Sequence, residues 1–201
     1  MLATSLRQSW SWPEARTIAC EIRHAVTIRD LRATGLEYRD RIRLLNQFVA
    51  SAAHLAPPLA IHWVTTEQLV DPRGFLVSLD HEGPESLFGA VNIRLFRIDR
   101  DESDRPLPSP EIIMDTLGLT AVGLDDFQIH TREYDPHDVG NYLYAVAQYS
   151  WQKGAVISAG DVIVGIDGDQ WKCEMEDALV EPDRAVIDID TDEPGLAGRK
   201  R

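Results

Sequence analysis

The sequence predicts an α+β fold, in which a mixed or antiparallel sheet carries two main helices and the chain forms two loosely similar halves. Two segments, residues 37–55 and 136–153, place apolar side chains at helical spacing. Shorter segments alternate apolar and polar residues, or form brief apolar runs bounded by Pro and Gly, which is typical of strands. With 201 residues and a hydrophobic fraction of 44%, the chain can bury a sizeable core.

In the first half, residues 18–28 alternate well between two faces and predict a half-buried strand. Residues 37–55 predict a helix, residues 59–64 a core strand, residues 67–79 a short helix interrupted by Pro-Arg-Gly, and residues 87–98 a further strand. The expected inner stripe of the long helix consists of Ile42, Leu45, Phe48, Val49, Ala52 and Leu55.

A polar, proline-rich segment, residues 99–110, predicts a loop between the halves. We therefore expect a single domain with an N-terminal α+β half (1–98), this loop, a C-terminal α+β half (111–189) and a polar tail (190–201).

Within the C-terminal half, residues 111–134 predict two short strands, or one strand bent at its glycines. Asp135 predicts the N-cap of the second long helix, with Pro in the first turn and Gly after the last one. Residues 155–175 predict a hairpin that turns at 167–169, and residues 184–189 predict a last strand. The expected inner face of the helix consists of Val139, Leu143, Val146, Tyr149 and Ser150, whereas Tyr144 and Trp151 are expected to project outward.

The charge is distributed unevenly. The net charge is −13, yet residues 1–100 carry 12 Arg against 11 Asp and Glu, and residues 101–201 carry 8 basic against 22 acidic residues. An acidic field repels phosphate backbones, so we expect no nucleic-acid partner. It would attract a basic protein, although an acidic surface also serves solubility alone.

Other compositional features concern location. No apolar run is long enough for a membrane span, and no segment resembles a signal peptide, so we expect no membrane association and a cytoplasmic location. The preference for Arg over Lys suggests a GC-rich bacterial source. Cys20 and Cys173 lie in segments predicted as strands and are expected to be inert and buried.

A motif in the second half points to a family. Residues 116–126 read Thr-Leu-Gly-Leu-Thr-Ala-Val-Gly-Leu-Asp-Asp, which resembles the block T-x-G-L…G-x-x-(D/E) of DUF4261, a bacterial family of unknown function. Residues 157–161 are similar to the family's dGDTxG turn, with Val162 in place of Thr; residues 134–136 and 181–182, and upstream residues 8–15 and 60–63, also fit the family pattern. The resemblance implies a structural motif and no established activity. Its residues are Thr116, Gly118, Leu119, Gly123, Asp126, Gly160, Asp161 and Gly165.

We expect no catalytic, cofactor-binding or metal-binding residues. Residues 188–192 resemble the start of a calcium loop, but Glu193 stands where that loop needs Gly, so an edge strand with outward aspartates is favoured. Asp161 and residues 167–169 suit turns better than a cation site. The six histidines lack metal-ligand spacing, and the serines lack a nucleophile elbow.

Three functions remain open. The first is a non-enzymatic protein-binding module, immunity-like or associated with toxins or secretion, that binds a basic partner. Its expected surface comprises Asp167, Asp169, Glu174, Glu176, Asp188, Asp190, Tyr144 and Trp151. The second is a hydrolase or transferase with a site between the halves that uses Asp126, His130 and His137. The third is a self-associating structural component.

Overall fold

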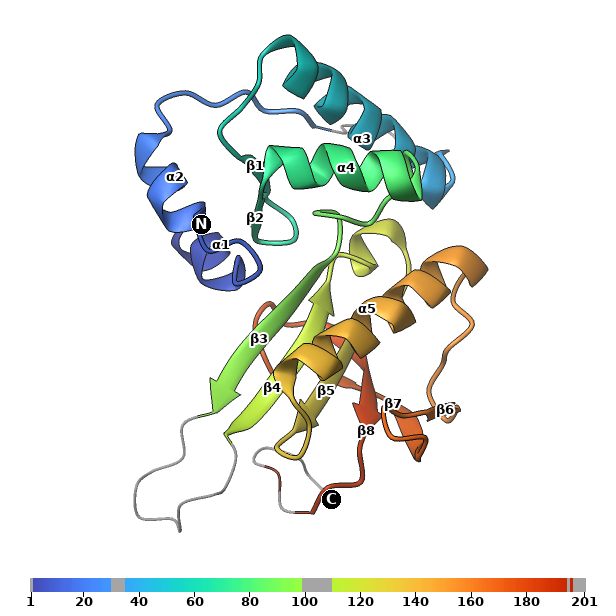
Figure 1. Ribbon diagram of the computed structural model, residues 1–201. Helices are drawn as coiled ribbons and strands as arrows, with labels where there is room; N and C mark the ends of the chain where they lie inside the picture. Colours follow the sequence, from blue (N-terminus) through green and yellow to red (C-terminus); the bar gives the residue numbers. More distant parts are fainter. Residues whose placement is uncertain (1, 30–34, 99–109, 195, 197–201) are drawn as a thin grey trace. The chain divides into compact units, whose positions relative to one another are not determined.

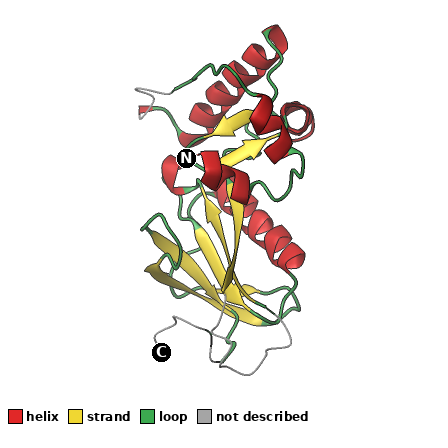
Figure 2. Ribbon diagram, turned by 90° about the vertical axis from the view of Figure 1, so that its left-hand side faces the viewer, coloured by secondary structure: helices red, strands yellow, loops and turns green. Residues whose placement is uncertain are grey.

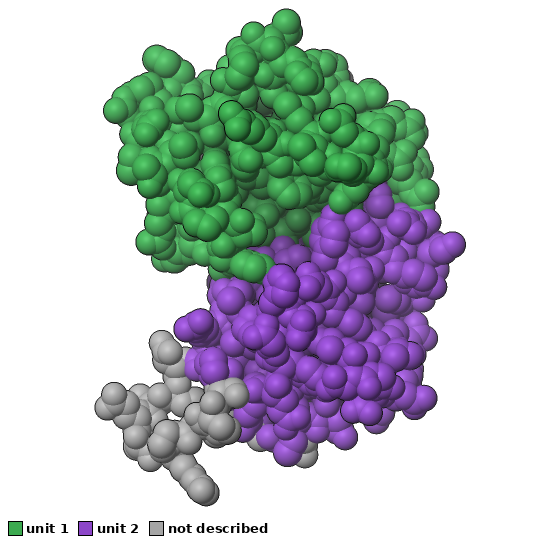
Figure 3. Space-filling model, viewed as in Figure 1, with its two compact units in different colours: residues 1–92 green, residues 93–201 purple. Residues whose placement is uncertain are grey.

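The computed structural model describes residues 2–29, 35–98, 110–194 and 196, and it confirms the α+β class (Figure 1). The chain forms two compact units, Met1–Asn92 and Ile93–Arg201 (Figure 3). None of the helices in the described part is both long and apolar enough to cross a bilayer. The predicted loop lies outside the described residues except for Pro110.

Unit 1 consists mainly of helices. Helix α1 (Leu2–Gln8), α2 (Ala15–Glu21), α3 (Tyr38–Leu55) and α4 (Pro72–Glu82) accompany a two-stranded antiparallel sheet of β1 (Ile61–Trp63) and β2 (Gln68–Val70). The helix predicted over residues 67–79 is wrong in its first part, where Gln68–Val70 form β2. Its predicted interruption is also wrong, because Pro72 stands in the first turn of α4, where a missing N–H costs nothing. The Asp71 carboxylate accepts from the N–H groups of Arg73 and Gly74, both at 3.2 Å, and caps this helix.

The predicted strand over residues 18–28 is also wrong. Its first part belongs to α2, and residues 22–29 have no regular structure. Period-two alternation stabilises a strand only where another strand pairs with it, and none of the described strands does so here. Cys20 is consequently exposed on α2, whereas Cys173 is buried.

Helix α3 forms where predicted, but two residues of its expected inner stripe lie outside. Phe48 is 64% exposed and Leu55 is 88% exposed. The buried face instead contains Asn46, whose Nδ2 donates to the carbonyl oxygens of Pro84 and Ser86, both at 3.0 Å. Apolar residues occur on both sides of this helix, so its sequence does not decide which side packs inward.

Unit 2 is built on a sheet (Figure 2). Its six strands have the order β3-β4-β5-β8-β7-β6. The strands are β3 (Asn92–Ile98), β4 (Glu111–Leu117), β5 (Phe127–Thr131), β6 (Val162–Val164), β7 (Gln170–Asp177) and β8 (Ala185–Asp190). Strands β5 and β8 pair in parallel, and the pairs β4–β5, β6–β7 and β7–β8 are antiparallel. The last strand forms where predicted, but it is central, so the interpretation of residues 188–192 as an edge strand with outward aspartates is wrong.

Helix α5 (Pro136–Lys153) lies on one face of this sheet, and its N-cap is Asp135, as predicted. The Asp135 side chain accepts from the His137 N–H at 2.8 Å. Two aromatic assignments on this helix are wrong: Trp151 is buried and Tyr149 is 51% exposed. Trp151 follows Leu143 by eight residues and Ala147 by four, so it continues the buried stripe at helical spacing.

Candidate functional site

The two faces of the sheet in unit 2 differ in chemistry. Trp171 packs against Tyr142 of α5 with ring centroids 5.2 Å apart, so its side of the sheet faces the helix. The strand registers place apolar side chains on that side, namely Cys173, Ile187, Ile189, Phe127, Ile129 and Met114.

The opposite face carries a polar row that crosses the sheet. Asp115 on β4 pairs with Gln128 on β5, Gln128 with Asp188 on β8, and Asp188 with Glu174 on β7. Arg94 on β3 extends the row, because its guanidinium binds Asp115. All these side chains except Glu174 are buried, so we call Arg94, Asp115, Gln128 and Asp188 the buried polar row.

One carboxylate in this row is shared by two guanidinium groups. Asp115 accepts from Arg94 at 2.9 and 2.5 Å and from Arg184 Nη2 at 2.7 Å. Burial raises the pKa of Asp115, and the hydrogen bonds and charges of the two arginines oppose that shift. The charged carboxylate of Asp115 is stable in this buried position only because both arginines bind it. Removing a partner from a buried ion pair leaves an uncompensated charge.

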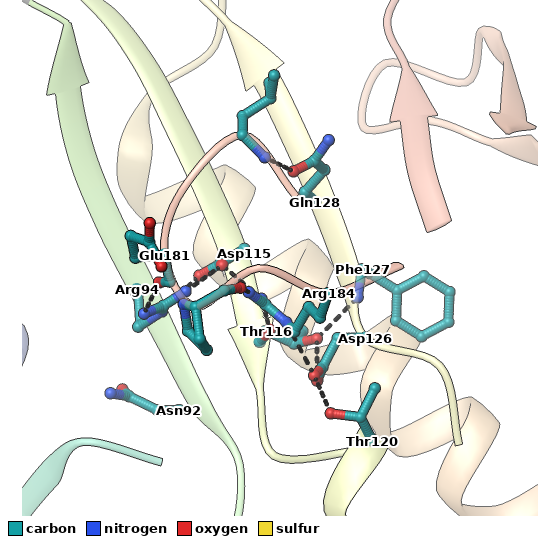
Figure 4. Close-up of polar contacts among 12 residues, drawn as sticks. Asn92, Arg94, Asp115, Thr116, Thr120, Asp126, Phe127, Gln128, Glu181 and Arg184 are labelled. Atoms are coloured by element: carbon teal, nitrogen blue, oxygen red, sulfur yellow. Dashed lines mark hydrogen bonds and ion pairs between the residues drawn. The ribbon is translucent and has the colours of Figure 1, made fainter. Parts of the chain in front are cut away.

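The loop between β7 and β8 covers the buried polar row. The Leu179 N–H donates to Gln128 Oε1 at 3.0 Å, and the Glu181 carbonyl accepts from Arg94 Nη1 at 2.8 Å (Figure 4). Arg184 also donates to the Thr116 carbonyl at 3.0 Å. The side chains that the loop covers therefore also hold the loop in place over the buried polar row.

Asp126 explains the motif at 116–126. Its Oδ1 accepts from Thr116 Oγ1 at 3.0 Å and from the N–H groups of Gly118 at 3.1 Å and Leu119 at 3.0 Å. Its Oδ2 accepts from Thr120 Oγ1 at 2.7 Å and Arg184 Nε at 3.3 Å. A carboxylate with five donors stabilises the turn and has little capacity left to act as a base.

The motif residues around β6 and β7 are also structural. Gly160 donates to the Cys173 carbonyl at 2.7 Å, and Asp161 Oδ2 accepts from the Ser158 N–H at 2.8 Å. A Cβ on Gly165 would lie 2.3 Å from the ring of Trp171, so only glycine fits beneath that ring. Tyr134 contacts the same ring, with centroids 5.2 Å apart.

The proposed acid–base residues are not brought together. Asp126 precedes β5 and His130 lies four residues further along it, which separates them by roughly 13 Å. His130 is buried, with Nε2 at 2.7 Å from Glu111 Oε1, whereas His137 is exposed at the start of α5. In the described residues, no group of three or more His, Cys, Asp or Glu side chains is arranged to hold a metal ion.

The exposed acidic residues of the predicted interaction surface lie on the hairpin of β6 and β7. Residues 155–177 contain six acidic side chains, Asp161, Asp167, Asp169, Glu174, Glu176 and Asp177, against Lys172 alone, which gives a net charge of −5. We call residues 155–177 the acidic hairpin. Its backing is rigid, because Trp171 is buried against two tyrosines and Tyr142 Oη donates to the Val164 carbonyl at 2.8 Å.

The predicted interaction surface is divided by the structure. Asp167, Asp169 and Glu174 are exposed, and Glu176, Asp190 and Tyr144 are half-exposed. Asp188 and Trp151 are 2% and 6% exposed, so their assignment to a surface is wrong. Asp188 is buried because β8 is central, and it accepts from Gln128 Nε2 at 3.0 Å.

Part of this unit resembles a known family. Residues 115–190 match the family model of a domain of unknown function, DUF4261. The DUF4261 match runs from β4 to the end of β8 and includes Asp115, Asp126 and Arg184. It confirms the resemblance for this segment, while the likeness at residues 8–15 and 60–63 lies outside it and stays a prediction. No curated protein and no solved structure matches the chain.

Sequence reasoning missed Arg94 and Arg184 as the partners of the Asp115 and Asp126 carboxylates. Arg184 directly precedes β8, and Arg94 interrupts an apolar strand. An arginine between the apolar residues Ile93 and Leu95 was the available signal, since a buried guanidinium requires an acidic partner.

Proposed function

We propose that this protein is a protein-binding module that docks a basic partner through the acidic hairpin. The observation that carries the proposal is the concentration of exposed acidic side chains on a rigid hairpin. Arg94, Asp115 and Asp188 of the same sheet are instead buried and engaged with one another or with Gln128. A surface of one sign raises the rate of encounter with an oppositely charged protein by roughly 10- to 1000-fold at low salt.

The rigidity of the hairpin supports the same proposal. A preorganised surface loses less conformational entropy when it binds, so more of the contact energy appears as affinity. The Tyr142 hydroxyl donates to the Val164 carbonyl, and because burial raises its pKa to about 12, it keeps this proton well into the alkaline range.

The test compares two variants with equal changes in net charge. The hairpin variant carries Asp167→Lys, Asp169→Lys and Glu174→Lys; the control variant carries Glu14→Lys, Glu21→Lys and Asp80→Lys, which replace exposed acids of unit 1. Both proteins and the unmodified chain serve as bait in cell extract of the source organism, washed at increasing salt and analysed by mass spectrometry.

We expect one basic protein to bind the unmodified chain and the control variant, to elute with salt, and to be lost from the hairpin variant. Purified partner should then associate at least about tenfold more slowly with the hairpin variant. Equal recovery on all three baits would contradict the proposal. Light scattering of the chain alone tests the alternative of self-association.

A further inference from the structure

We propose that the acidic hairpin binds its partner by strand addition, with an extended basic segment pairing along the free edge of β6. This inference rests on the proposed function and specifies the form of the partner: a strand in which Lys or Arg alternates with β-branched or other apolar residues.

Among the described strands, β6 has a neighbour on one side only. Strand β6 pairs with β7 through the register Val162↔Lys172, Ile163↔Trp171 and Val164↔Gln170, and it is the last strand of the six. The adjoining bonds join Gly165 N–H to the Asp169 carbonyl and Cys173 N–H to the Asp161 carbonyl.

These bonds determine which backbone groups face away from β7. In an antiparallel pair, alternate residues direct both N–H and C=O to the partner strand. The Asp161 carbonyl and the Gly165 N–H bond to β7, and Ile163 lies between them in the same orientation; the Asp161 N–H instead donates to the Ser158 carbonyl. Val162 and Val164 therefore point to the free edge. The Val164 carbonyl already accepts from Tyr142 Oη. The Val162 N–H and C=O and the Val164 N–H remain directed outward for an added strand.

The side chains of this edge are unusual for an unprotected strand. Natural edge strands are commonly protected by charged residues, Pro or bulges. Strand β6 reads Val-Ile-Val, with Val162 53% exposed and Val164 67% exposed. Its shortness is the protective feature that remains, and it limits pairing to a short segment of the partner. The opposite edge, β3, contains Arg94 and Arg97 within its seven residues.

The carboxylates around β6 favour a basic partner strand. Asp161 precedes β6, Asp167 and Asp169 follow it in the turn, and Glu174 is exposed on β7, on the same face of the sheet as Val162 and Val164. A strand added beside β6 would place its apolar side chains next to the two valines and its basic side chains within reach of these carboxylates. At the other edge, the exposed Arg97 of β3 disfavours the same basic segment, whereas Arg94 is buried and paired with Asp115.

The probe is an eight-residue peptide with blocked ends in which Lys and Val alternate. Its affinity for the full chain is measured by fluorescence anisotropy, and protection of the Val162 and Val164 amides is measured by NMR hydrogen exchange. Two control peptides carry Glu in place of Lys, or N-methyl groups on alternate backbone amides. The N-methylated peptide keeps all charges but lacks the N–H donors along one edge of its backbone.

Two protein variants complete the design. Val162→Pro removes the outward N–H without disturbing the hydrogen bonds to β7. Edge strands tolerate Pro at positions whose N–H points away from the neighbouring strand. Val162→Thr keeps this N–H and the β-branched shape. We expect the Lys–Val peptide to bind and to slow exchange at both amides. Val162→Pro should weaken binding of the Lys–Val peptide roughly three- to tenfold, and N-methylation of the peptide should weaken it at least about tenfold. The affinity of Val162→Thr should stay within about twofold of the unmodified chain.

Two results would overturn strand addition: no binding of the Lys–Val peptide, or equal binding of its N-methylated form. The peptide comparison does not depend on the folding of any variant. Charge-dependent binding that is insensitive to N-methylation would reject strand addition and leave the proposed function intact. Retention of the cellular partner by the hairpin variant would reject the proposed function itself.

Discussion

Replacing Asp126 should destabilise unit 2 more than any exposed substitution. In Asp126→Ala, the Thr116 hydroxyl and the N–H groups of Gly118 and Leu119 lose their acceptor, and all three residues are buried. Each unsatisfied buried donor costs about 1–3 kcal/mol. Thr120 is exposed and can bond to water, and Arg184 keeps Asp115, so these partners add less. We therefore expect a loss of about 3–5 kcal/mol in the free energy of unfolding.

Asp126→Asn separates hydrogen bonding from charge. The amide oxygen can keep the three bonds made by Oδ1, while its NH₂ group faces the Arg184 donor, so we expect a smaller loss of about 1–2 kcal/mol. Asp125→Asn, at a half-exposed neighbour, serves as the matched control with a change within about 0.5 kcal/mol.

The assay is urea unfolding at equilibrium, combined with hydrogen exchange read on peptic fragments to assign the loss to residues 93–201. A change below about 1 kcal/mol for Asp126→Ala would refute the reasoning, because three buried donors would then have cost almost nothing. Loss of protection confined to residues 1–92 would refute it as well.

Three further predictions concern the hairpin and the thiols. Gly165→Ala forces a Cβ to within 2.3 Å of the Trp171 ring and should cost about 1–3 kcal/mol in urea unfolding; a change below about 0.5 kcal/mol would show that the hairpin yields freely. A thiol reagent at pH 8 should label Cys20 alone in the native chain and also Cys173 in denaturant, because burial raises the Cys173 pKa to about 11; rapid labelling of both in the native chain would contradict its burial. Stability should fall as pH rises from 9 toward 11, since the unfolded chain releases the protons of Cys173 and Tyr142 at their ordinary pKa values of 9.0 and 10.0, while burial raises the folded values to about 11 and about 12. A Cys173→Ala variant should show a shallower fall, and an identical slope would exclude the thiol as a cause.

Local chemistry made several elements predictable. The long helices follow from apolar spacing, and α5 begins at Asp135 because a carboxylate there caps the first N–H groups. The hairpin turn at 167–169 follows from Gly and Asp preferences, and the motif at 116–126 follows from a resemblance that the family match supports. Each of these signals acts over a few residues, so the sequence contains it directly.

The polar groups of the sheet required the tertiary structure. The pattern Asp188-Ile-Asp190 alternates like an edge strand, and nothing within it shows that β5 pairs alongside and buries Asp188. The shared carboxylate of Asp115 depends on Arg94 and Arg184, which are 21 residues before it and 69 residues after it. Such contacts depend on register and strand order, which no local pattern specifies.

The sequence by itself determined the class of fold, the two long helices, the turn chemistry and the acidic character of the second half, because all of these depend on composition or near neighbours. Only the tertiary structure decided which face of α3 is buried, that β8 is central, and that β6 is left at an edge among carboxylates. The reason is physical: burial and pairing are properties of what lies beside a residue in space, and long-range partners set them.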